Sequence, residues 1–484
     1  MADGTAAASL LQDVRRWADR QGIETRFGVF NPANGALVGE APDMGAGETE
    51  AAIAAAAQAL PAWAAQTAKA RAEILRRWRD LILHREIELA HLLTAEQGKP
   101  FEEALGEVRF GASFIEWFAE EGRRLYGDVI PSHAPGKRLL TLKQPIGVVA
   151  AITPWNFPNG MVARKVAPAL AAGCCVVLKP AEDTPLSAIA LAILAAEAGV
   201  PPDAFRVVTA KAPAEVAETL TASPTVRKLS FTGSTPVGKL LMRQCAATVK
   251  KVSLELGGNA PFIVFEDADL DAAVAGAVAS KFRNAGQTCV SANRIYVQAS
   301  IMEAFAARFS AAVAKLVVGE GANLSTNVGP LINAAALGKV DGLVRDAVAK
   351  GALAVLGGER HPRRGTFYRP TILTGVTADM EIAHAEIFGP VAPLFTFETE
   401  AEVVRRANDT PYGLAAYFWT RDIGRAFRVG EALEYGMVGL NEGLISSEAA
   451  PFGGIKESGI GREGSKYGLE DYVEIKYLLL GGLA

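Results

Sequence analysis

Between residues 145 and 258, short apolar segments alternate with segments of helical periodicity, and this alternation limits the folds open to the chain. The segments GVVAAI, CCVVLKP, FRVVTA, KLSFTGS and KKVSLELGG have the composition of buried strands. Strands that alternate with helices form a parallel sheet with helices on both faces, and such strands are short and apolar throughout. The sequence therefore predicts an α/β lobe built on a doubly wound parallel sheet.

A second, less regular series follows and predicts a second α/β lobe, with the boundary near Gly257-Gly258. It contains helical patterns at 269–286 and 301–316, a strand at 292–298, and a helix, turn and strand at 401–420. Upstream, 51–60 and 70–97 are predicted to be helical, the latter ended by Gly98 and Pro100. The C-terminal segment DYVEIKYLLLGG predicts a strand that needs a partner edge, which another subunit could supply.

Composition excludes several classes of protein. Of 484 residues, 50% are hydrophobic and 21% charged, which is globular usage and excludes a disordered chain. A formal net charge of -4 leaves no basic excess for nucleic acid. The longest uncharged run, 144–163, is interrupted by prolines, asparagines and a glycine, which argues against a membrane span. Four cysteines without a C-x-x-C pair indicate a cytoplasmic protein without a disulfide framework, and we expect no metal site.

Four features could carry chemistry, and each has a structural alternative. Cys289, in NAGQTCV, is either a nucleophile on a loop or a buried structural thiol. Glu255, at a strand end, is either a general base or a solvated carboxylate. Asn156, in TPWNFP, is either an oxyanion donor or part of an Asx-turn. The turn 233–238 lies between a strand and a helix, where backbone N–H groups can bind phosphate, but it lacks a standard nucleotide motif.

Seven motifs in order carry a family resemblance. They are TPWNFP, VVLKPAEDTP, SFTGSTPVG, LELGGNAP, NAGQTC, EIFGP and PFGGIKESGIGRE. Together they resemble the aldehyde dehydrogenase superfamily, essentially from end to end. The resemblance implies two doubly wound α/β lobes with a small β extension. It places a NAD-binding domain at 1–127 and 147–256, a catalytic domain at 257–445, and an oligomerisation segment at 128–146 and 468–484 of a homodimer or homotetramer.

The resemblance also implies a mechanism. Cys289 would attack the aldehyde carbon, and Asn156 with the Cys289 backbone N–H would hold the oxygen of the thiohemiacetal. Hydride transfer to the nicotinamide would leave a thioester, and Glu255 would activate the water that hydrolyses it. A CoA-acylating enzyme, in which a thiol replaces water, is disfavoured because it does not need Glu255. A non-catalytic protein on the same fold is disfavoured because all three residues are present.

The same family positions imply a cofactor site. The implied residues are Thr153, Pro154, Trp155, Lys179, Glu182, Gly233, Ser234, Gly238, Leu256, Glu386 and Phe388. Glu182 would accept hydrogen bonds from the adenosine ribose hydroxyls and repel a 2′-phosphate. Two unit charges about 4 Å apart interact by roughly 4 kcal/mol at an effective dielectric near 20, as an upper guide. We therefore expect NAD, with NADP as the alternative.

Finer features resemble the succinate-semialdehyde dehydrogenases. The segments FRNAGQTC, MVARKVAPALAAG and GLISSEAAPFGG carry Arg283, Arg164 and Ser446, which in that group bind the free carboxylate of the semialdehyde. Arginine suits this role because its planar fork pairs with both carboxylate oxygens, although either arginine could instead be a surface cation. Glutarate semialdehyde is the alternative substrate, since one methylene in a pocket is worth only about 1–3 kcal/mol; a broader aldehyde range is the other.

Overall fold

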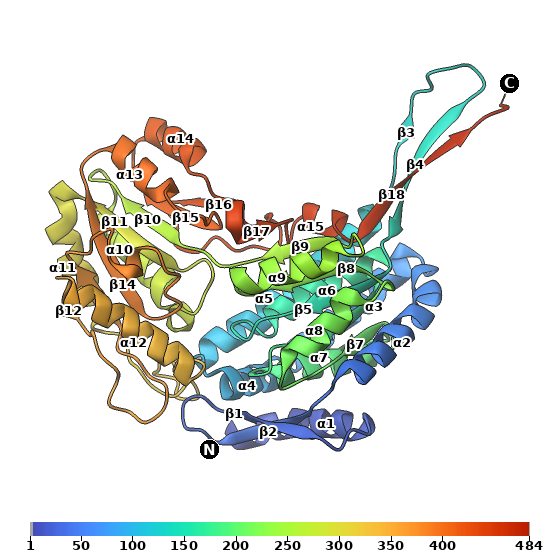
Figure 1. The fold of residues 1–484 in the computed structure, drawn as a ribbon, viewed down its shortest axis with the longest axis horizontal. Coiled ribbons are helices and arrows are strands. Elements are labelled where there is room, and N and C mark those ends of the chain that lie inside the picture. The colour runs from blue at the N-terminus through green and yellow to red at the C-terminus, as the bar shows by residue number, and fades with distance from the viewer. Residues whose placement is uncertain (1–2, 484) are drawn as a thin grey trace.

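The computed structural model describes residues 3–483, which form two α/β lobes and a projecting arm (Figure 1). The first lobe is built on a sheet with the strand order β17-β9-β8-β5-β6-β7. All neighbouring strands in it are parallel except β17, which runs antiparallel to β9. Its strands are β5 (Val148–Ile152), β6 (Cys175–Lys179), β7 (Phe205–Val207), β8 (Val226–Thr232), β9 (Lys251–Glu255) and β17 (Gly459–Ile460).

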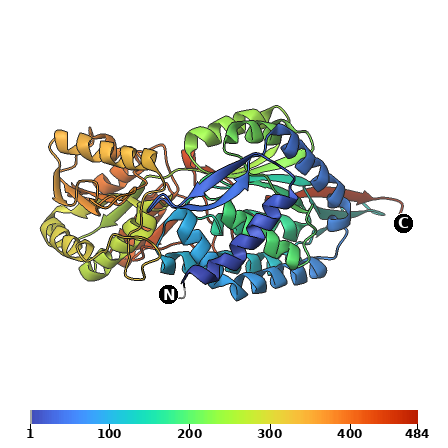
Figure 2. The same cartoon turned by 90° about the horizontal axis from the view of Figure 1, so that it is seen from below.

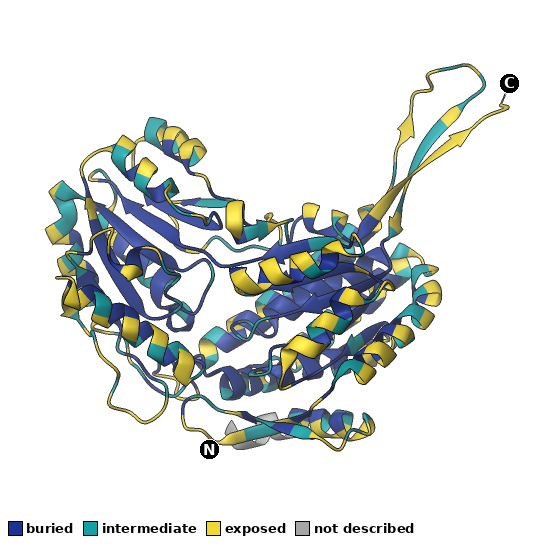
Figure 3. Cartoon of the chain, in the orientation of Figure 1, coloured by how far each residue is buried: buried dark blue, intermediate teal, exposed yellow. Residues whose placement is uncertain are grey.

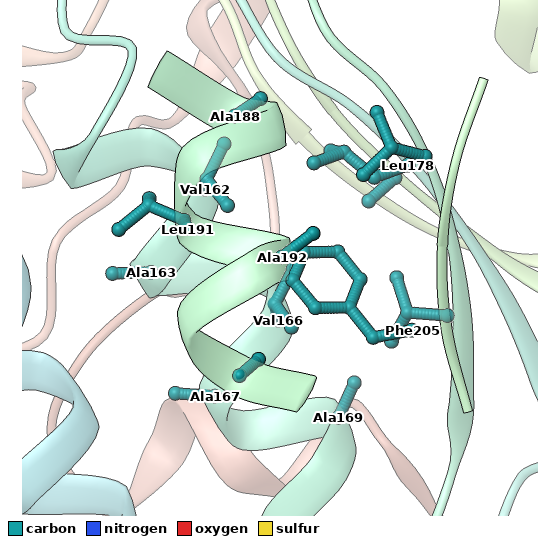
Figure 4. Packing of buried hydrophobic residues seen from close by; sticks show 14 of the residues in the cluster. Val162, Ala163, Val166, Ala167, Ala169, Leu178, Ala188, Leu191, Ala192 and Phe205 are labelled. Carbon is teal, nitrogen blue, oxygen red and sulfur yellow. The ribbon is translucent and has the colours of Figure 1, made fainter. Parts of the chain in front are cut away.

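Helices alternate with these strands, as the sequence predicts. The helices that connect successive strands are α6 (Gly160–Ala172), α7 (Pro185–Glu197), α8 (Pro213–Ala222) and α9 (Thr235–Ala246). Figure 4 shows Val162 and Val166 of α6 and Leu191 of α7 beside Leu178 of β6 and Phe205 of β7. All five side chains are buried, so this packing fixes the loop that precedes α6 against the sheet.

The N-terminal part of the chain covers the first lobe (Figure 2). It consists of α1 (Asp3–Arg20), the antiparallel pair β1 (Arg26–Phe30) and β2 (Leu37–Pro42), then α2 (Ala46–Ala64), α3 (Ala68–His84), α4 (Glu86–Gln97), α5 (Phe101–Glu121) and the short η1 (Gly122–Arg124). The expected single helix over 70–97 is therefore two helices. The break falls at Arg85, whose backbone leaves the helical region and whose guanidinium pairs with Asp13 and Glu88.

The second lobe is built on a sheet with the order β12-β13-β14-β11-β10-β15-β16, parallel except at the β12 edge. Its strands are β10 (Ala260–Val264), β11 (Ala292–Gln298), β12 (Leu353–Leu356), β13 (Thr371–Thr374), β14 (Val391–Phe397), β15 (Ala415–Trp419) and β16 (Met437–Leu440). Its helices are α10 (Leu270–Phe282), η2 (Arg283–Gly286), η3 (Ala299–Ile301), α11 (Met302–Val313), α12 (Ala334–Ala349), η4 (Glu381–Ala383), α13 (Glu400–Asn408) and α14 (Ile423–Ala432).

The chain passes from the first sheet to the second between Glu255 and Ala260, a segment that includes Gly257-Gly258. The chain later returns to the first lobe through η5 (Lys456–Ser458), where β17 joins the first sheet. The expected domain boundaries do not assign β17 to any domain. The inner strands of both sheets are largely buried, whereas the edge strand β12 and the outer helices have exposed faces (Figure 3). None of the helices within residues 3–483 combines the length and apolar character that crossing a membrane requires.

The arm is an antiparallel sheet of β3 (Val129–Ile130), β4 (Arg138–Pro145) and β18 (Val473–Leu480), and α15 (Tyr467–Glu470) lies at its base. The C-terminal strand thus finds a partner edge within its own chain, where Val473 pairs with Pro145 and Leu480 with Arg138. Most of β18 is nevertheless exposed, including Ile475 at 68% and Tyr477 at 53% (Figure 3). Its outer edge has no strand beside it in the described part of the chain.

Candidate active site

Two cavities meet at Cys289, which lies in the loop between η2 and β11. One has a volume of about 300 Å³ and the other about 310 Å³. Cys289, unlike the three fully buried cysteines, is partly accessible. The placement makes this thiol the reactive candidate of the four, because it alone borders a space that a substrate could enter.

The loop that contains Cys289 is held by close contacts to its backbone. A Cβ atom on Gly258 would lie 2.5 Å from the carbonyl oxygen of Cys289, so only glycine permits this approach. From the other side, the Tyr417 hydroxyl on β15 donates a hydrogen bond of 2.8 Å to the carbonyl of Val290. The Cys289 loop is therefore fixed between the first residues after β9 and strand β15 of the second sheet.

Burial raises the pKa of the Cys289 thiol to about 12. The Glu386 and Glu255 carboxylates raise the pKa further, whereas Arg164 and Arg283 act in the opposite direction. The thiol is thus protonated at neutral pH, and its attack on a carbonyl requires that a base take the proton.

Asn156 lies in the loop between β5 and α6 and is buried. Its Nδ2 donates a hydrogen bond of 3.0 Å to the carbonyl of Gln287, two residues before Cys289. Because an amide nitrogen carries two hydrogens, one N–H remains for another acceptor. Asn156 also lines the cavity of about 310 Å³ together with Cys289, so the structure brings the two residues together as the sequence predicts.

Glu255 ends β9 and is buried, but it lines neither cavity wall. Its Oε2 has no hydrogen-bond partner among the described residues. Burial raises the pKa of Glu255 well above the usual carboxyl range, and the nearby Glu463 carboxylate raises it further. Lys165 and Arg164 hold the pKa of Glu463 below its ordinary value, although burial alone would raise it. Of this carboxylate pair, Glu463 is the ionised member and Glu255 binds a proton readily.

The cavity of about 310 Å³ has the residues expected at a cofactor site along much of its wall. It is lined by Pro154, Trp155, Gly233, Ser234, Leu256, Glu386 and Phe388 of the predicted set. The rings of Trp155 and Phe388 meet edge to face, 5.5 Å apart. Glu386 Oε1 accepts a hydrogen bond of 3.0 Å from the backbone N–H of Gly258. Ser234 is the N-cap of α9, so the start of that helix opens toward this cavity.

Four predicted cofactor residues lie outside that cavity wall. Lys179, at the end of β6, forms an ion pair of 3.1 Å with Glu182, and its carbonyl accepts a hydrogen bond from the Thr153 N–H. Gly238 acts through packing, because a Cβ atom there would lie 2.3 Å from Leu256 Cδ2. The glycine lets α9 approach Leu256, which does line the cavity. These residues extend the predicted site along the carboxyl ends of β5, β6 and β8.

The cavity of about 300 Å³ contains the three predicted carboxylate-binding residues, Arg164, Arg283 and Ser446. Arg283 lies 5.5 Å from the centre of the Phe157 ring, and no carboxylate of the described residues lies within ion-pair distance of it. Arg164 is 2% exposed and lies 2.9 Å from Glu463, a partner that the sequence did not predict. Its Nε and Nη2 groups still lack a directed hydrogen bond in the part of the chain that the structure describes.

A family model described as the aldehyde dehydrogenase family matches residues 17–478. The chain belongs to this family. It is 61% identical over 465 residues to a succinate-semialdehyde dehydrogenase from Escherichia coli that carries NADP(+) in its name, covering 96% of each chain. It is 60% identical to a glutarate-semialdehyde dehydrogenase from Pseudomonas aeruginosa and 59% identical to a 3-sulfolactaldehyde dehydrogenase from Pseudomonas putida, again over 96% of each chain.

Solved structures agree with this assignment. An NADP-dependent enzyme from E. coli superimposes with a TM-score of 0.94 at 61% identity, covering 94% of this chain and 95% of that one. A succinate-semialdehyde dehydrogenase from Burkholderia pseudomallei superimposes with a TM-score of 0.94 at 59% identity, and 95% of each chain is covered. The predicted aldehyde dehydrogenase fold is confirmed.

Several residues that line the cavities of this aldehyde dehydrogenase were not predicted. On the first cavity they are Glu103, Gly106, Glu107, Phe110, Phe157, Gly160, Met161, Thr288, Val290, Leu444 and Phe452, and on the second Thr232, Gly257, Ile332, Asn333, Ala336 and Lys339. Phe157, Thr232, Gly257, Thr288 and Phe452 fall within the quoted motifs, so the motifs were a signal for them. The α5 and α12 residues have no such signal, because only the tertiary fold brings those helices to Cys289.

Proposed function

We propose that this aldehyde dehydrogenase oxidises succinate semialdehyde to succinate with NAD. The observation that supports the proposal is a cavity with Cys289 on its wall and two arginines, Arg164 and Arg283, beside it, of which Arg164 alone forms an ion pair with a carboxylate of the described residues. Phe110, Phe157 and Phe452 supply an apolar wall. Such a cavity suits a short aliphatic aldehyde that carries an anionic group at its far end.

The anionic end of the substrate would bind Arg283, Arg164 and Ser446. No carboxylate of the described residues lies within ion-pair distance of Arg283, so a substrate carboxylate would supply a direct partner. Arg164 already pairs with Glu463, and its unsatisfied N–H groups can add hydrogen bonds to the same carboxylate. Glutarate semialdehyde is the second candidate, because a relative of similar identity is named for it and one methylene changes binding by only about 1–3 kcal/mol.

The residues around Cys289 can perform the steps of aldehyde oxidation. The Cys289 thiol would pass its proton to solvent water as the sulfur adds to the aldehyde carbon, and the spare N–H of Asn156 would stabilise the oxygen that becomes negatively charged. After oxidation to the thioester, Glu255 would take a proton from water, for which its raised pKa makes it a good acceptor near neutral pH once it is ionised. When bound, the nicotinamide cofactor supplies the hydride acceptor for this reaction.

The second cavity fits a dinucleotide in three respects. Backbone N–H groups at the start of α9 open toward it next to Gly233 and suit a phosphate. The carboxylate of Glu386 can accept hydrogen bonds from ribose hydroxyls, and its remaining oxygen, Oε2, lies beside Gly257. The aromatic pair of Trp155 and Phe388 gives an apolar wall.

Glu182 supports NAD as the preferred cofactor. Its side chain is 34% exposed and lies at the end of β6, where the adenosine ribose of a dinucleotide would be bound. The ion pair with Lys179 reduces the repulsion that a 2′-phosphate would meet but leaves the carboxylate oxygens available to ribose hydroxyls.

Replacing Glu182 by serine should raise the ratio of kcat/KM with NADP to kcat/KM with NAD. Removing the carboxylate removes a like charge near the 2′-phosphate and frees Lys179, so we expect a gain of about tenfold, which is about 1.4 kcal/mol. Steady-state kinetics with both cofactors measure the ratio, and Glu182→Gln separates charge from size. A wild-type protein that already prefers NADP would contradict the argument.

The exposed arm supports a homodimer or homotetramer. Apolar side chains on β18, including Ile475, Tyr477 and Leu479, are exposed beside an unpaired strand edge. Such edges are normally covered in soluble proteins. A second copy of the chain would cover them, and sedimentation at micromolar concentration would give the mass of the assembly.

One assay tests the proposed function and its alternatives. NADH formation is followed with succinate semialdehyde, glutarate semialdehyde, 3-sulfolactaldehyde and butyraldehyde, each with and without CoA. We expect the highest kcat/KM with succinate semialdehyde and no requirement for CoA. Dependence on CoA would favour the acylating reaction, and absence of NADH with every aldehyde would contradict the proposal.

Replacing Arg283 by alanine should reduce kcat/KM for succinate semialdehyde by about 10–150-fold, since a charge-assisted hydrogen bond contributes roughly 1.5–3 kcal/mol. Butyraldehyde lacks the carboxylate and should lose far less. Arg283→Met is the matched control, because it keeps an aliphatic chain over Phe157 and removes only the charge. Equal losses on the two aldehydes would mean that Arg283 has a structural role.

A further inference from the structure

A buried amide joins the loop of Asn156 to the loop of Cys289. Asn284 Nδ2 donates to the carbonyl of Asn156 at 3.0 Å and to the carbonyl of Gln287 at 3.3 Å. The first carbonyl belongs to the loop after β5, and the second lies two residues before Cys289. One side chain therefore contacts both loops that carry the reacting groups.

The orientation of the Asn284 amide is set from the first lobe. Gln97 Nε2 donates to Asn284 Oδ1 at 3.0 Å, and the backbone N–H of Asn284 donates to Glu103 Oε2 at 2.8 Å. Asn284 itself has a left-handed backbone, with φ of 51°, which asparagine tolerates better than most residues. With its oxygen occupied by Gln97, the amide presents its nitrogen to Asn156 and Gln287.

This arrangement controls where the Asn156 amide points. The carbonyl of Asn156 is held by Asn284 and, at 2.7 Å, by Lys99 Nζ. The Asn156 side chain donates to the same Gln287 carbonyl that Asn284 contacts. Since Asn156 Oδ1 has no partner among the described residues, these contacts alone fix the direction of its free N–H.

We propose that Asn284 is a positioning residue that acts through Asn156. Asn284 lines neither cavity, so it does not contact the substrate. Its amide binds both the carbonyl of Asn156 and the carbonyl of Gln287, which accepts from the Asn156 side chain, and so fixes these two groups relative to each other. The inference rests on the proposed function, because it requires that Asn156 stabilise the developing oxyanion. Without Asn284, the free N–H of Asn156 would no longer be held toward Cys289.

Asn284→Gly tests this role without straining the left-handed backbone, which glycine adopts freely. We expect the first-turnover rate of NADH formation to fall about 10–100-fold, less than the roughly 10²–10³-fold cost of deleting an oxyanion donor. KM for NAD and for the semialdehyde should change by less than about threefold, because both binding walls are intact. Asn284→Asp keeps the size and backbone tolerance, replaces the donor by an acceptor, and should slow the enzyme at least as much.

The matched control is Asn408→Gly. The Asn408 amide also bridges two backbone groups, with a bond of 2.8 Å to the carbonyl of Ala432 and one of 2.9 Å from the Glu434 N–H, but it lies at the end of α13 and lines neither cavity. Its first-turnover rate should match the wild-type rate. Thermal melting of all variants identifies any that do not fold, and Asn284→Asp carries the test if Asn284→Gly is among them.

A double-mutant cycle with Asn156→Ala decides whether Asn284 acts through Asn156. We expect Asn284→Gly to slow first-turnover NADH formation by less than about twofold when Asn156 is already alanine, because the group that it positions is gone. A further 10–100-fold loss in that background would overturn the proposal. Wild-type protein that oxidises no semialdehyde would instead refute the proposed function, so the two failures are distinguishable.

Discussion

Replacing Cys289 by alanine is expected to abolish aldehyde oxidation, with kcat reduced by about 10⁴-fold or more. No other cysteine can replace it, because Cys174, Cys175 and Cys245 are all buried away from the two cavities. The affinity for NAD, measured by calorimetry, should change little, since Cys289 is one residue among many on the wall of the proposed dinucleotide cavity.

The matched control for this prediction is Cys245→Ala. Cys245 is a buried thiol that lies near the end of α9 and borders neither cavity, so its variant should keep the wild-type turnover. Because the pKa of Cys289 is raised to about 12, alkylation by iodoacetamide should accelerate with pH across the neutral range. Turnover of the Cys289→Ala protein within tenfold of wild type would show that another group is the nucleophile.

The parts of the fold that depend on local sequence could be predicted. The strands β5 and β6 are buried at every residue, and their apolar composition, interrupted only by Lys179 at the end of β6, is the signal for such strands. Glycine also predicts where a helix ends, as at Gly98, which follows α4 with a left-handed φ of 93°. Cys289 and Asn156 could be singled out because each lies in a motif, and in the structure both line one cavity.

Other parts depend on contacts that no local pattern encodes. The sequence predicts a helix through residue 286, but α10 ends at Phe282 and Asn284 to Gly286 are left-handed. A hydrogen bond from Gln97 to the Asn284 side chain and one from the Asn284 backbone N–H to Glu103 stabilise this turn, and both partners lie nearly two hundred residues away in the chain. The ion pair between Glu463 and Arg164 could not be predicted for the same reason, because it forms only once β17 has returned to the first sheet.

Replacing Glu255 by glutamine should separate the two halves of the reaction. In the proposed mechanism the Glu255 carboxylate is not the base for oxidation of the aldehyde, so the first turnover should still release one NADH per active site. Hydrolysis of the thioester should then slow by about 10²–10⁴-fold, the usual contribution of a general base. Stopped-flow measurement of NADH should therefore show a burst followed by slow turnover, whereas wild type shows a faster steady state.

The pH dependence gives the same prediction a second test. In the proposed mechanism, water attack requires ionised Glu255, and because the pKa of Glu255 is raised, its ionised fraction increases about tenfold per pH unit below that pKa. The hydrolysis rate should rise with pH in wild type and lose this dependence in Glu255→Gln. Glu96→Gln is the matched control: Glu96 is also buried with a pKa raised to about 8, but it accepts hydrogen bonds from Leu186 and Ser187 at the start of α7. The Glu96→Gln protein should have a lower melting temperature but the wild-type ratio of burst rate to steady-state rate. If the Glu255→Gln protein also kept the wild-type ratio, Glu255 would be excluded as the base.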